Sequence, residues 1–358
     1  MSLLDPKTET EAETETGTGA GTGAPTGSVT REPDAETAPR EPGAAGRPSR
    51  AVHGRWRRGR VLVVAALLLA LLLAAHGLVP NGAGRVGSLL ETFLPWLGAG
   101  VPVLLVLAAV RRSAAAGVAV LVPAVVWCSL FGGLLVDKRS GGGDLTVVSH
   151  NVGEANPDPA RTARDLAASG AGLLALEELS ARTAPVYARA LDGSYPYHSV
   201  QGTVGLWSKH PLRDVRPVAI MPWTRALRAT VVTPKGPVAV YGVHLASVRV
   251  RPGTGFATER RDEAAARLAE AVRAERLPRV VVVGDLNGTT GDRALRPVTS
   301  LLSSAQEEAG AGFGFTWPAS FPVARIDQIL VKGVTAASSW TLPRTGSDHL
   351  PVAASLRL

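Results

Sequence analysis

Three apolar runs in the first part of the chain constrain its fold more than any other feature. They are Val61–Val79, Phe93–Val110 and Ala114–Val136. Each is close to the roughly 20 residues that a helix needs to cross a hydrocarbon core about 30 Å thick. The alternatives are buried helices of a soluble domain or, for the first run, a signal peptide, which the length of chain before it disfavours. The pattern therefore predicts three transmembrane helices over residues 61–136.

The segment before these runs has a different character. Residues 1–60 show no apolar periodicity and are rich in Thr, Glu, Gly and Pro. Such a segment cannot bury enough apolar surface to offset its ordering entropy, so we expect a disordered cytoplasmic tail. Its basic end, Arg55–Arg60, and the pair Arg111-Arg112 are expected to stay in the cytoplasm. Three spans then place everything after Val136 outside the cell, in a multi-pass protein of the plasma membrane.

A linker over residues 137–143 precedes a domain over residues 144–358, where β-branched runs alternate with Ala-, Arg- and Glu-rich stretches. The longest expected helix is Thr258–Arg276. The expected strands are Leu145–Val148, Leu173–Leu176, Gly205–Ser208, Leu227–Val232, Val238–Leu245, Arg279–Val283, Ile326–Val331 and Val352–Leu356. Many strands with few long helices predict an α+β domain in which two packed sheets are covered by helices.

Charge and cysteine content narrow the function. The formal net charge is +8, and residues 144–358 carry 24 Lys and Arg against 19 Asp and Glu, a net +5. A positive balance fits a phosphate-bearing substrate or loops that face anionic lipid, but +5 is mild for a nucleic-acid binder. The single cysteine, Cys128, excludes an intramolecular disulfide and a cysteine-based zinc cluster.

Polar residues at the ends of the expected strands suggest one shared site. A strand end is where a rigid scaffold presents a side chain to a cleft. The residues are Asn151, Glu177, Glu178, His244, Asp285, Asn287, Asp327, Asp348 and His349. All are acidic, amide or imidazole side chains, which points to one chemistry.

That chemistry is metal-assisted hydrolysis of a phosphoester. Carboxylate and amide oxygens suit Mg²⁺ or Mn²⁺, which would polarise a phosphoryl oxygen. A carboxylate that does not bind the metal could deprotonate the attacking water, and imidazoles could donate hydrogen bonds to phosphate oxygens. The sequence has no Gly-rich phosphate loop, G-x-S-x-G elbow or H-E-x-x-H motif, which disfavours three common alternatives.

Short motifs around these residues carry a family resemblance. They are Ser149–Val152, Leu174–Glu178, Gly205–Leu212, Val243–Leu245, Val283–Asn287, Arg325–Asp327 and Gly346–Val352. In this order they resemble the endonuclease/exonuclease/phosphatase superfamily, and the amino-terminal spans resemble its membrane-anchored bacterial subset. The resemblance covers about residues 145–358. It implies a four-layer α/β/β/α sandwich of two packed mixed sheets flanked by helices.

The resemblance also implies roles. Glu178 would be the main ligand of Mg²⁺ or Mn²⁺, with Asn151 and Asp348 beside it. Glu177 stands where the family usually has Gln, and it adds negative charge if it faces the site.

Five further residues would carry out catalysis. Asp285 would act on the nucleophilic water, and Asn287 would help to position the phosphoryl group. His244 would contact the phosphate, and Asp327 would orient His349.

Three other residues have weaker claims. Asn156 is a candidate for the edge of the site. Arg228 and Arg249 could contact a substrate phosphate, although such arginines are more often solvated charges.

The sequence thus predicts a membrane-anchored, metal-dependent phosphoester hydrolase with an outward-facing domain, of phosphodiesterase or nuclease type. Its substrate would be a nucleic acid, a nucleotide or a phospholipid head group, and no obligate protein partner is evident. The alternative is a catalytically silent binding module on the same fold.

Overall fold

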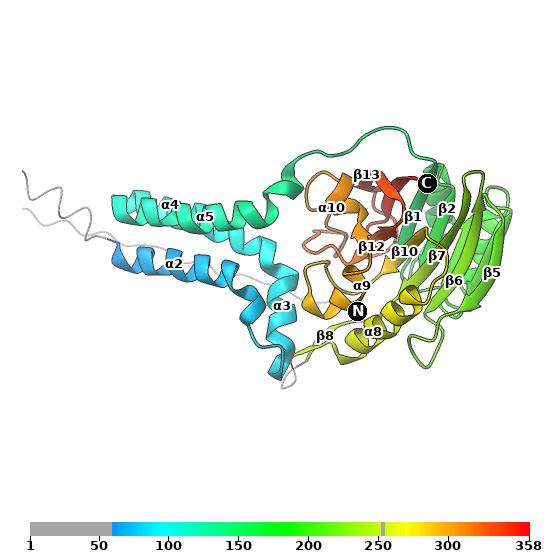
Figure 1. Cartoon of the computed structure of the whole chain (residues 1–358), viewed down its shortest axis with the longest axis horizontal. Coiled ribbons are helices and arrows are strands. Elements are labelled where there is room, and N and C mark those ends of the chain that lie inside the picture. Colours follow the sequence, from blue (N-terminus) through cyan, green and yellow to red (C-terminus); the bar gives the residue numbers. More distant parts are fainter. Residues whose placement is uncertain (1–58, 252–254) are drawn as a thin grey trace, which may run out of the picture. The chain divides into compact units, whose positions relative to one another are not determined.

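The structure is a computed structural model that describes residues 59–251 and 255–358. All of them belong to the larger of two compact units, Ser49–Leu358. The tail expected over residues 1–60 lies, but for its last two residues, outside the described residues, so its disorder stays a prediction. Within the described unit, apolar helices precede a domain built on two six-stranded sheets (Figure 1).

The apolar part contains four α-helices and three short 3₁₀ helices. They are α2 (Arg60–Ala74), η1 (His76–Leu78), η2 (Ala83–Arg85), α3 (Val86–Phe93), η3 (Leu94–Ala99), α4 (Gly100–Val110) and α5 (Ala114–Leu135). Among the described residues, two stretches are long and apolar enough to cross a membrane, Val86–Val110 and Ala114–Leu135. Helix α2 has 15 residues. At 1.5 Å per residue it spans about 22 Å, short of a core about 30 Å thick. The expectation of three full-length spans is therefore wrong.

Contacts with the domain over residues 144–358 explain why the first apolar run does not continue as a helix. Arg293 donates hydrogen bonds of 2.9 Å to the carbonyl oxygens of His76, Gly77 and Val79. These carbonyls therefore have partners without a longer helix, and the chain turns through η1. Sequence periodicity could not show this, because the partner lies more than 200 residues away.

The domain is built on two mixed sheets. The order in the first is β13 (Thr335–Thr341), β14 (Val352–Arg357), β1 (Leu145–Asn151), β2 (Leu173–Glu177), β4 (Val204–Ser208) and β3 (Tyr197–Gln201). The order in the second is β11 (Ser303–Ser304), β12 (Asp327–Lys332), β10 (Val280–Asp285), β7 (Gly236–His244), β6 (Ala226–Thr233) and β5 (Leu212–Pro217). Strands β8 (Arg249–Arg251) and β9 (Gly255–Ala257) pair as a separate antiparallel two-stranded sheet. Strands β1 and β2 are parallel, as are β7 and β10, and the other pairs within the two large sheets are antiparallel.

Helices cover the outer faces of both sheets. They are α6 (Pro159–Ala168) and α7 (Ala184–Leu191) on the first, and α8 (Glu259–Arg273) and α9 (Arg296–Thr299) on the second; η4 (Arg293–Leu295) and α10 (Ala305–Ala309) complete the domain. Strand alternation fixes these layers. Val281 of β10 faces the core between the sheets, whereas Val282 faces the cluster that includes α8. In β1, Val147 and Val148 divide in the same way. The structure confirms the expected sandwich of two mixed sheets flanked by helices.

One glycine is required where β10 ends. Gly284 has a φ of 146°, and a Cβ added there would lie 1.8 Å from the carbonyl oxygen of Val243 in β7. The backbones of the two strands can approach only because residue 284 has no side chain. Asp285 follows directly, so this approach helps to set its position.

We predict that Gly284→Ala lowers the Tm of the full-length protein in detergent by about 4–24 °C. Strain and overpacking each cost about 1–3 kcal/mol, and each kcal/mol shifts Tm by about 2–4 °C in a domain of this size. Circular dichroism would measure it. Gly193→Ala is the control, because a Cβ there meets nothing within 4 Å. Equal Tm values for the two variants would contradict the argument.

Candidate active site

The pairing of the strands brings the predicted catalytic residues together. Asp285, the last residue of β10, lies opposite His244 of β7 and opposite Asp327 of β12. In the other sheet, Asn151 at the end of β1 lies opposite Glu177 at the end of β2. The two sheets therefore present these strand ends at one edge of the sandwich.

Asp285 is the centre of the cluster. Its Oδ2 accepts hydrogen bonds from the side-chain amides of Asn151, at 3.0 Å, and Asn287, at 3.1 Å. Its Oδ1 accepts one from the backbone N–H of Asn287, at 2.8 Å. Burial, reinforced by the negative charge of Asp327, raises the pKa of Asp285 to about 7. A carboxyl with a pKa near neutrality suits a general base.

His349 and Asp327 form a buried pair. The Nδ1 of His349 lies 2.9 Å from Oδ2 of Asp327, and its Nε2 lies 4.0 Å from Oδ2 of Asp285. Burial by itself lowers the pKa of His349, but the charge and hydrogen bond of Asp327 outweigh it and raise this pKa to about 10. His349 is therefore protonated at neutral pH. Its loop is fixed by Ser347, whose hydroxyl donates to the carbonyl oxygen of Asn151 at 2.6 Å.

His244 has the opposite electrostatic environment. Its Nε2 lies 3.6 Å from Oδ2 of Asp285 and 3.7 Å from Oε1 of Glu178. Burial, the charge of Arg225 and that of His349 hold its pKa well below the usual value, so the ring is neutral. Arg225 donates a hydrogen bond from Nη2 to this ring.

Sequence reasoning missed Arg225. It directly precedes β6, and its carbonyl oxygen accepts a hydrogen bond of 2.8 Å from the backbone N–H of His244. Burial lowers the pKa of its guanidinium, and the charges of Asp285 and Glu178 oppose that shift. An arginine before a strand carries no sequence signal by itself, because the pairing of β6 with β7 creates the contact.

Glu178 and Asp348 border the cluster. Glu178 has a φ of 58°, and its side chain is 32% exposed. Its Oε2 accepts a hydrogen bond of 3.2 Å from the backbone N–H of Glu154. Asp348 is exposed, and its Oδ2 accepts a hydrogen bond of 3.2 Å from the indole of Trp317. No site role was expected for Trp317.

Two groups of side chains fit a divalent cation. Asp285, Asp327 and His349 offer buried ligand atoms that all lie within 4.8 Å of one another. Those atoms already hydrogen-bond to each other or to neighbouring amides. Glu178 instead offers a partly exposed carboxylate, and Asn151 lies on the neighbouring strand. Both groups include the hard oxygen ligands that Mg²⁺ and Mn²⁺ prefer.

Three of the remaining sequence candidates have structural partners. Glu177 continues the inward alternation of Leu173 and Ala175, and burial raises its pKa well above the usual value. This shift disfavours the charged form of Glu177, so burial opposes the negative charge that we considered. Asn156 donates to the carbonyl oxygen of Val152 at 2.9 Å, and the buried Arg228 pairs with Glu275 at 2.9 Å; the side chain of Arg249 lies outside the described residues.

Comparison with known families agrees with this geometry. The model of the Endonuclease/Exonuclease/phosphatase family matches residues 148–349. The chain therefore belongs to this family. No curated protein matches the chain.

Several solved structures share the fold. An endonuclease/exonuclease/phosphatase from Bacteroides vulgatus is 17% identical, with a TM-score of 0.52 over 61% of this chain and 100% of that one. A family protein from Bacteroides thetaiotaomicron is also 17% identical, with a TM-score of 0.50 over 59% of this chain and 94% of that one. Humanized D. rerio TDP2 is 19% identical, with a TM-score of 0.50 over 60% of this chain and 99% of that one. At such identities the likeness shows the fold alone.

The pair formed by Asp327 and His349 predicts a pH effect. Removing the charge of Asp327 lowers the pKa of His349, so Asp327→Asn should move the basic limb of the kcat/KM profile to lower pH. The losses from Asp327→Asn and His349→Ala should also be non-additive in the double variant, because the two residues act as a unit.

The measurement is kcat/KM against pH for an aryl phosphodiester. Asp165→Asn is the control, because this exposed aspartate lies on α6 and its loss should leave the limb in place. A basic limb at the same pH in Asp327→Asn, or additive losses, would show that the pair does not act together.

Proposed function

We propose that this chain is a divalent-metal-dependent phosphoester hydrolase of phosphodiesterase or nuclease type. The observation that carries the proposal is a buried carboxyl of near-neutral pKa, Asp285, that faces a protonated imidazole, His349. The carboxyl that would deprotonate water and the imidazole that would donate to a phosphoryl oxygen are thus 4.0 Å apart, measured from Oδ2 of Asp285 to Nε2 of His349. Membership of the Endonuclease/Exonuclease/phosphatase family supports the same reaction class.

The side chains divide the work as follows. The side-chain amides of Asn151 and Asn287 hold Asp285 in place. In its ionised form Asp285 takes a proton from the attacking water. Protonated His349 donates a charge-assisted hydrogen bond from Nε2 to a phosphoryl oxygen as charge develops there. Arg225, beside neutral His244, adds a fixed positive charge. A bound Mg²⁺ or Mn²⁺, held through Glu178, would supply Lewis-acid polarisation of the phosphoryl group.

The alternative is a silent binding module on the same fold. A silent module has no need of a buried carboxyl with a raised pKa next to a buried Asp–His pair. Such an arrangement costs folding free energy and is typical of catalytic sites. The complete set of Asp285, Asp327 and His349 therefore favours an enzyme.

We also propose that the apolar helices anchor the protein in the plasma membrane, with the catalytic domain outside. The large hydrophobic side chains of α2, α4 and α5 are mostly exposed, which a soluble protein rarely tolerates. The starts of α2 and α5 lie together, because a Cβ on Gly59 would lie 2.6 Å from Oγ of Ser113. Arg60 directly follows Gly59, and the pair Arg111-Arg112 directly precedes Ser113, so this end of the helices is basic.

The opposite end of the helices contacts the domain. The carbonyl oxygen of Leu134, at the end of α5, accepts a hydrogen bond of 2.7 Å from the backbone N–H of Gly312. The basic end of the bundle is thus the end away from the catalytic domain. Since Lys and Arg favour the cytoplasmic side, this arrangement supports an outward-facing domain.

The metal site predicts the behaviour of Glu178→Gln. This variant keeps the shape but removes the charge, so kcat/KM at limiting Mg²⁺ should fall about 10–100-fold and partly recover at high Mg²⁺. The assay is Mg²⁺-dependent hydrolysis of an aryl phosphodiester by the full-length protein. Asp285→Asn should lose about 10²–10⁴-fold at every Mg²⁺ concentration.

Glu154→Gln is the matched control, because this exposed neighbour contributes its backbone N–H to Glu178 rather than its side chain. An unchanged Mg²⁺ dependence in Glu178→Gln, with a shifted dependence in Asp327→Asn, would place the ion in the buried group instead. No hydrolysis by the wild type at any Mg²⁺ concentration would favour the silent module.

The topology can be tested with single cysteines. In a Cys128→Ser background, a membrane-impermeant maleimide should label Gly193→Cys in intact cells, because this residue is exposed on the catalytic domain. Arg111→Cys, at the opposite end of the bundle, should react only after lysis. Labelling of Arg111→Cys but not Gly193→Cys in intact cells would reverse the proposed orientation.

A further inference from the structure

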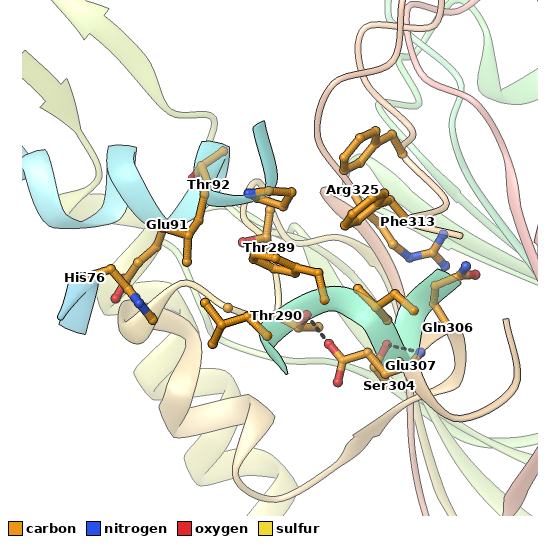
Figure 2. Close-up of a pocket in the computed structure, with 18 of the residues that line it drawn as sticks. His76, Glu91, Thr92, Thr289, Thr290, Ser304, Gln306, Glu307, Phe313 and Arg325 are labelled. Atoms are coloured by element: carbon orange, nitrogen blue, oxygen red, sulfur yellow. Dashed lines mark hydrogen bonds between the residues drawn. The ribbon is translucent and has the colours of Figure 1, made fainter. Parts of the chain in front are cut away.

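A cavity of about 460 Å³ lies where the apolar helices meet the catalytic domain (Figure 2). Leu130 and Phe131 of α5 line it from the helix side, and Thr290 and Phe313 line it from the domain side. Its volume falls in the range of small-molecule sites, roughly 300–1,000 Å³. Nothing in the proposed catalytic cycle uses this space.

Part of the wall suits a hydrocarbon chain. The ring centroids of Phe131 and Phe313 lie 5.9 Å apart, and those of Phe313 and Phe315 lie 5.0 Å apart in a stacked arrangement. Leu130 and Leu134 extend this surface along the last turns of α5. Because α5 is a candidate membrane span, its end lies where a lipid chain would be available.

Other atoms of the lining suit a polar group. Gln306 is 3% exposed and Arg325 is 7% exposed. Oε1 of Gln306, Nη2 of Arg325 and Oγ1 of Thr289 are buried without a hydrogen-bond partner among the described residues. Buried polar atoms are rarely left unpaired in a finished structure. A ligand with both polar and apolar parts fits this lining better than a purely apolar one.

The cavity also borders the catalytic loops. Thr289 follows Asn287 by two residues, and Arg325 precedes Asp327 by two residues. Two residues of extended chain cover only about 7 Å. The lining of the cavity is therefore separated from Asn287 and Asp327 by only short stretches of chain.

An aromatic segment connects the two regions directly. Trp96 of η3 stacks on Phe315 at 5.7 Å and donates from its indole to the carbonyl oxygen of Val323 at 2.7 Å. Trp317 lies between Phe315 and Val323 in the sequence, and its indole donates a hydrogen bond to Asp348, the residue before His349. Phe321, in the same segment, is 68% exposed. Exposed Trp and Phe at the end of membrane helices are typical of the lipid–water interface.

We propose that the cavity binds a bilayer lipid and that the catalytic centre hydrolyses a phosphoester of that lipid. This inference rests on the proposed function and names its substrate class. The hydrocarbon would lie against Leu130, Phe131 and Leu134. In the reaction, water adds to phosphorus, the bond from phosphorus to the alcohol oxygen breaks, and the proton taken from water ends on the released alcohol.

Gly133 of α5 allows the cavity to be filled. It lines the cavity, and a Cβ added there meets nothing within 4 Å. Gly133→Trp should occupy the space of the lipid chain, and Gly133→Leu should fill it partly. Gly117→Trp is the matched control on the same helix, 16 residues or about 24 Å away, where a Cβ also meets nothing.

The full-length protein would be assayed with Mg²⁺ on two substrates. One is bis(p-nitrophenyl) phosphate, and the other is mixed vesicles of phosphatidylethanolamine and phosphatidylglycerol, with products followed by mass spectrometry. We expect Gly133→Trp to lower kcat/KM on vesicles about tenfold or more, and Gly133→Leu to lower it less. Both variants should stay within about twofold of wild type on the soluble ester, and Gly117→Trp should do so on both substrates.

Hydrolysis of the soluble ester without hydrolysis of vesicle lipid would overturn this inference and leave the proposed function standing. Wild-type hydrolysis of vesicle lipid by Gly133→Trp would have the same consequence. An equal loss of activity on both substrates in Gly133→Trp and in Gly133→Leu would also overturn the inference. Failure of the wild type on both substrates would instead overturn the proposed function.

Discussion

The position of β10 between β7 and β12 is the constraint on which the candidate active site depends. Its last residue, Asp285, lies opposite His244 on one side and Asp327 on the other. A shift of one residue would turn every side chain of β10 to the other face, so the apolar core and the site are fixed together. Gly284 permits the close approach of β7. Burial of this edge then raises the pKa of Asp285, whereas the charge and hydrogen bond of Asp327 raise the pKa of His349 against the effect of burial.

A second set of buried polar contacts ties the catalytic loop to the rest of the chain. The buried guanidinium of Arg261 donates to the carbonyl oxygen of Asn287 at 3.0 Å and pairs with Asp292 at 2.7 Å. Ser88 of α3 donates to the same Asp292 at 3.0 Å. Removing one partner of a buried pair typically costs about 3–5 kcal/mol. The apolar helices are thus linked through side chains to the loop that carries Asn287.

Much of the domain could be predicted because its signals are local. The apolar run that forms β10 and the acidic and amide residues after it stand in a single stretch of sequence, and the motifs around them led to the family that the comparison confirms. The length of α2 could not be predicted, because Arg293, more than 200 residues further along the chain, donates hydrogen bonds to the carbonyl oxygens of His76 and Gly77 just after this helix. The site role of Arg225 was missed for the same reason, since it arises from strand pairing. The assignments of Glu178, Asn151 and Asp348 as metal ligands stay predictions.

The sequence by itself determined the two-sheet sandwich and the identity of the polar groups at the strand ends. Each of these follows from residue types and from alternation along single segments. Tertiary structure alone decided which groups face each other and what charge they carry. It lowered the pKa of His244, through burial and the charge of Arg225, and raised the pKa of His349, because the charge and hydrogen bond of Asp327 outweigh burial there. It also created the cavity between α5 and the catalytic loops, since a cavity depends on how distant segments pack rather than on the order of residues in either.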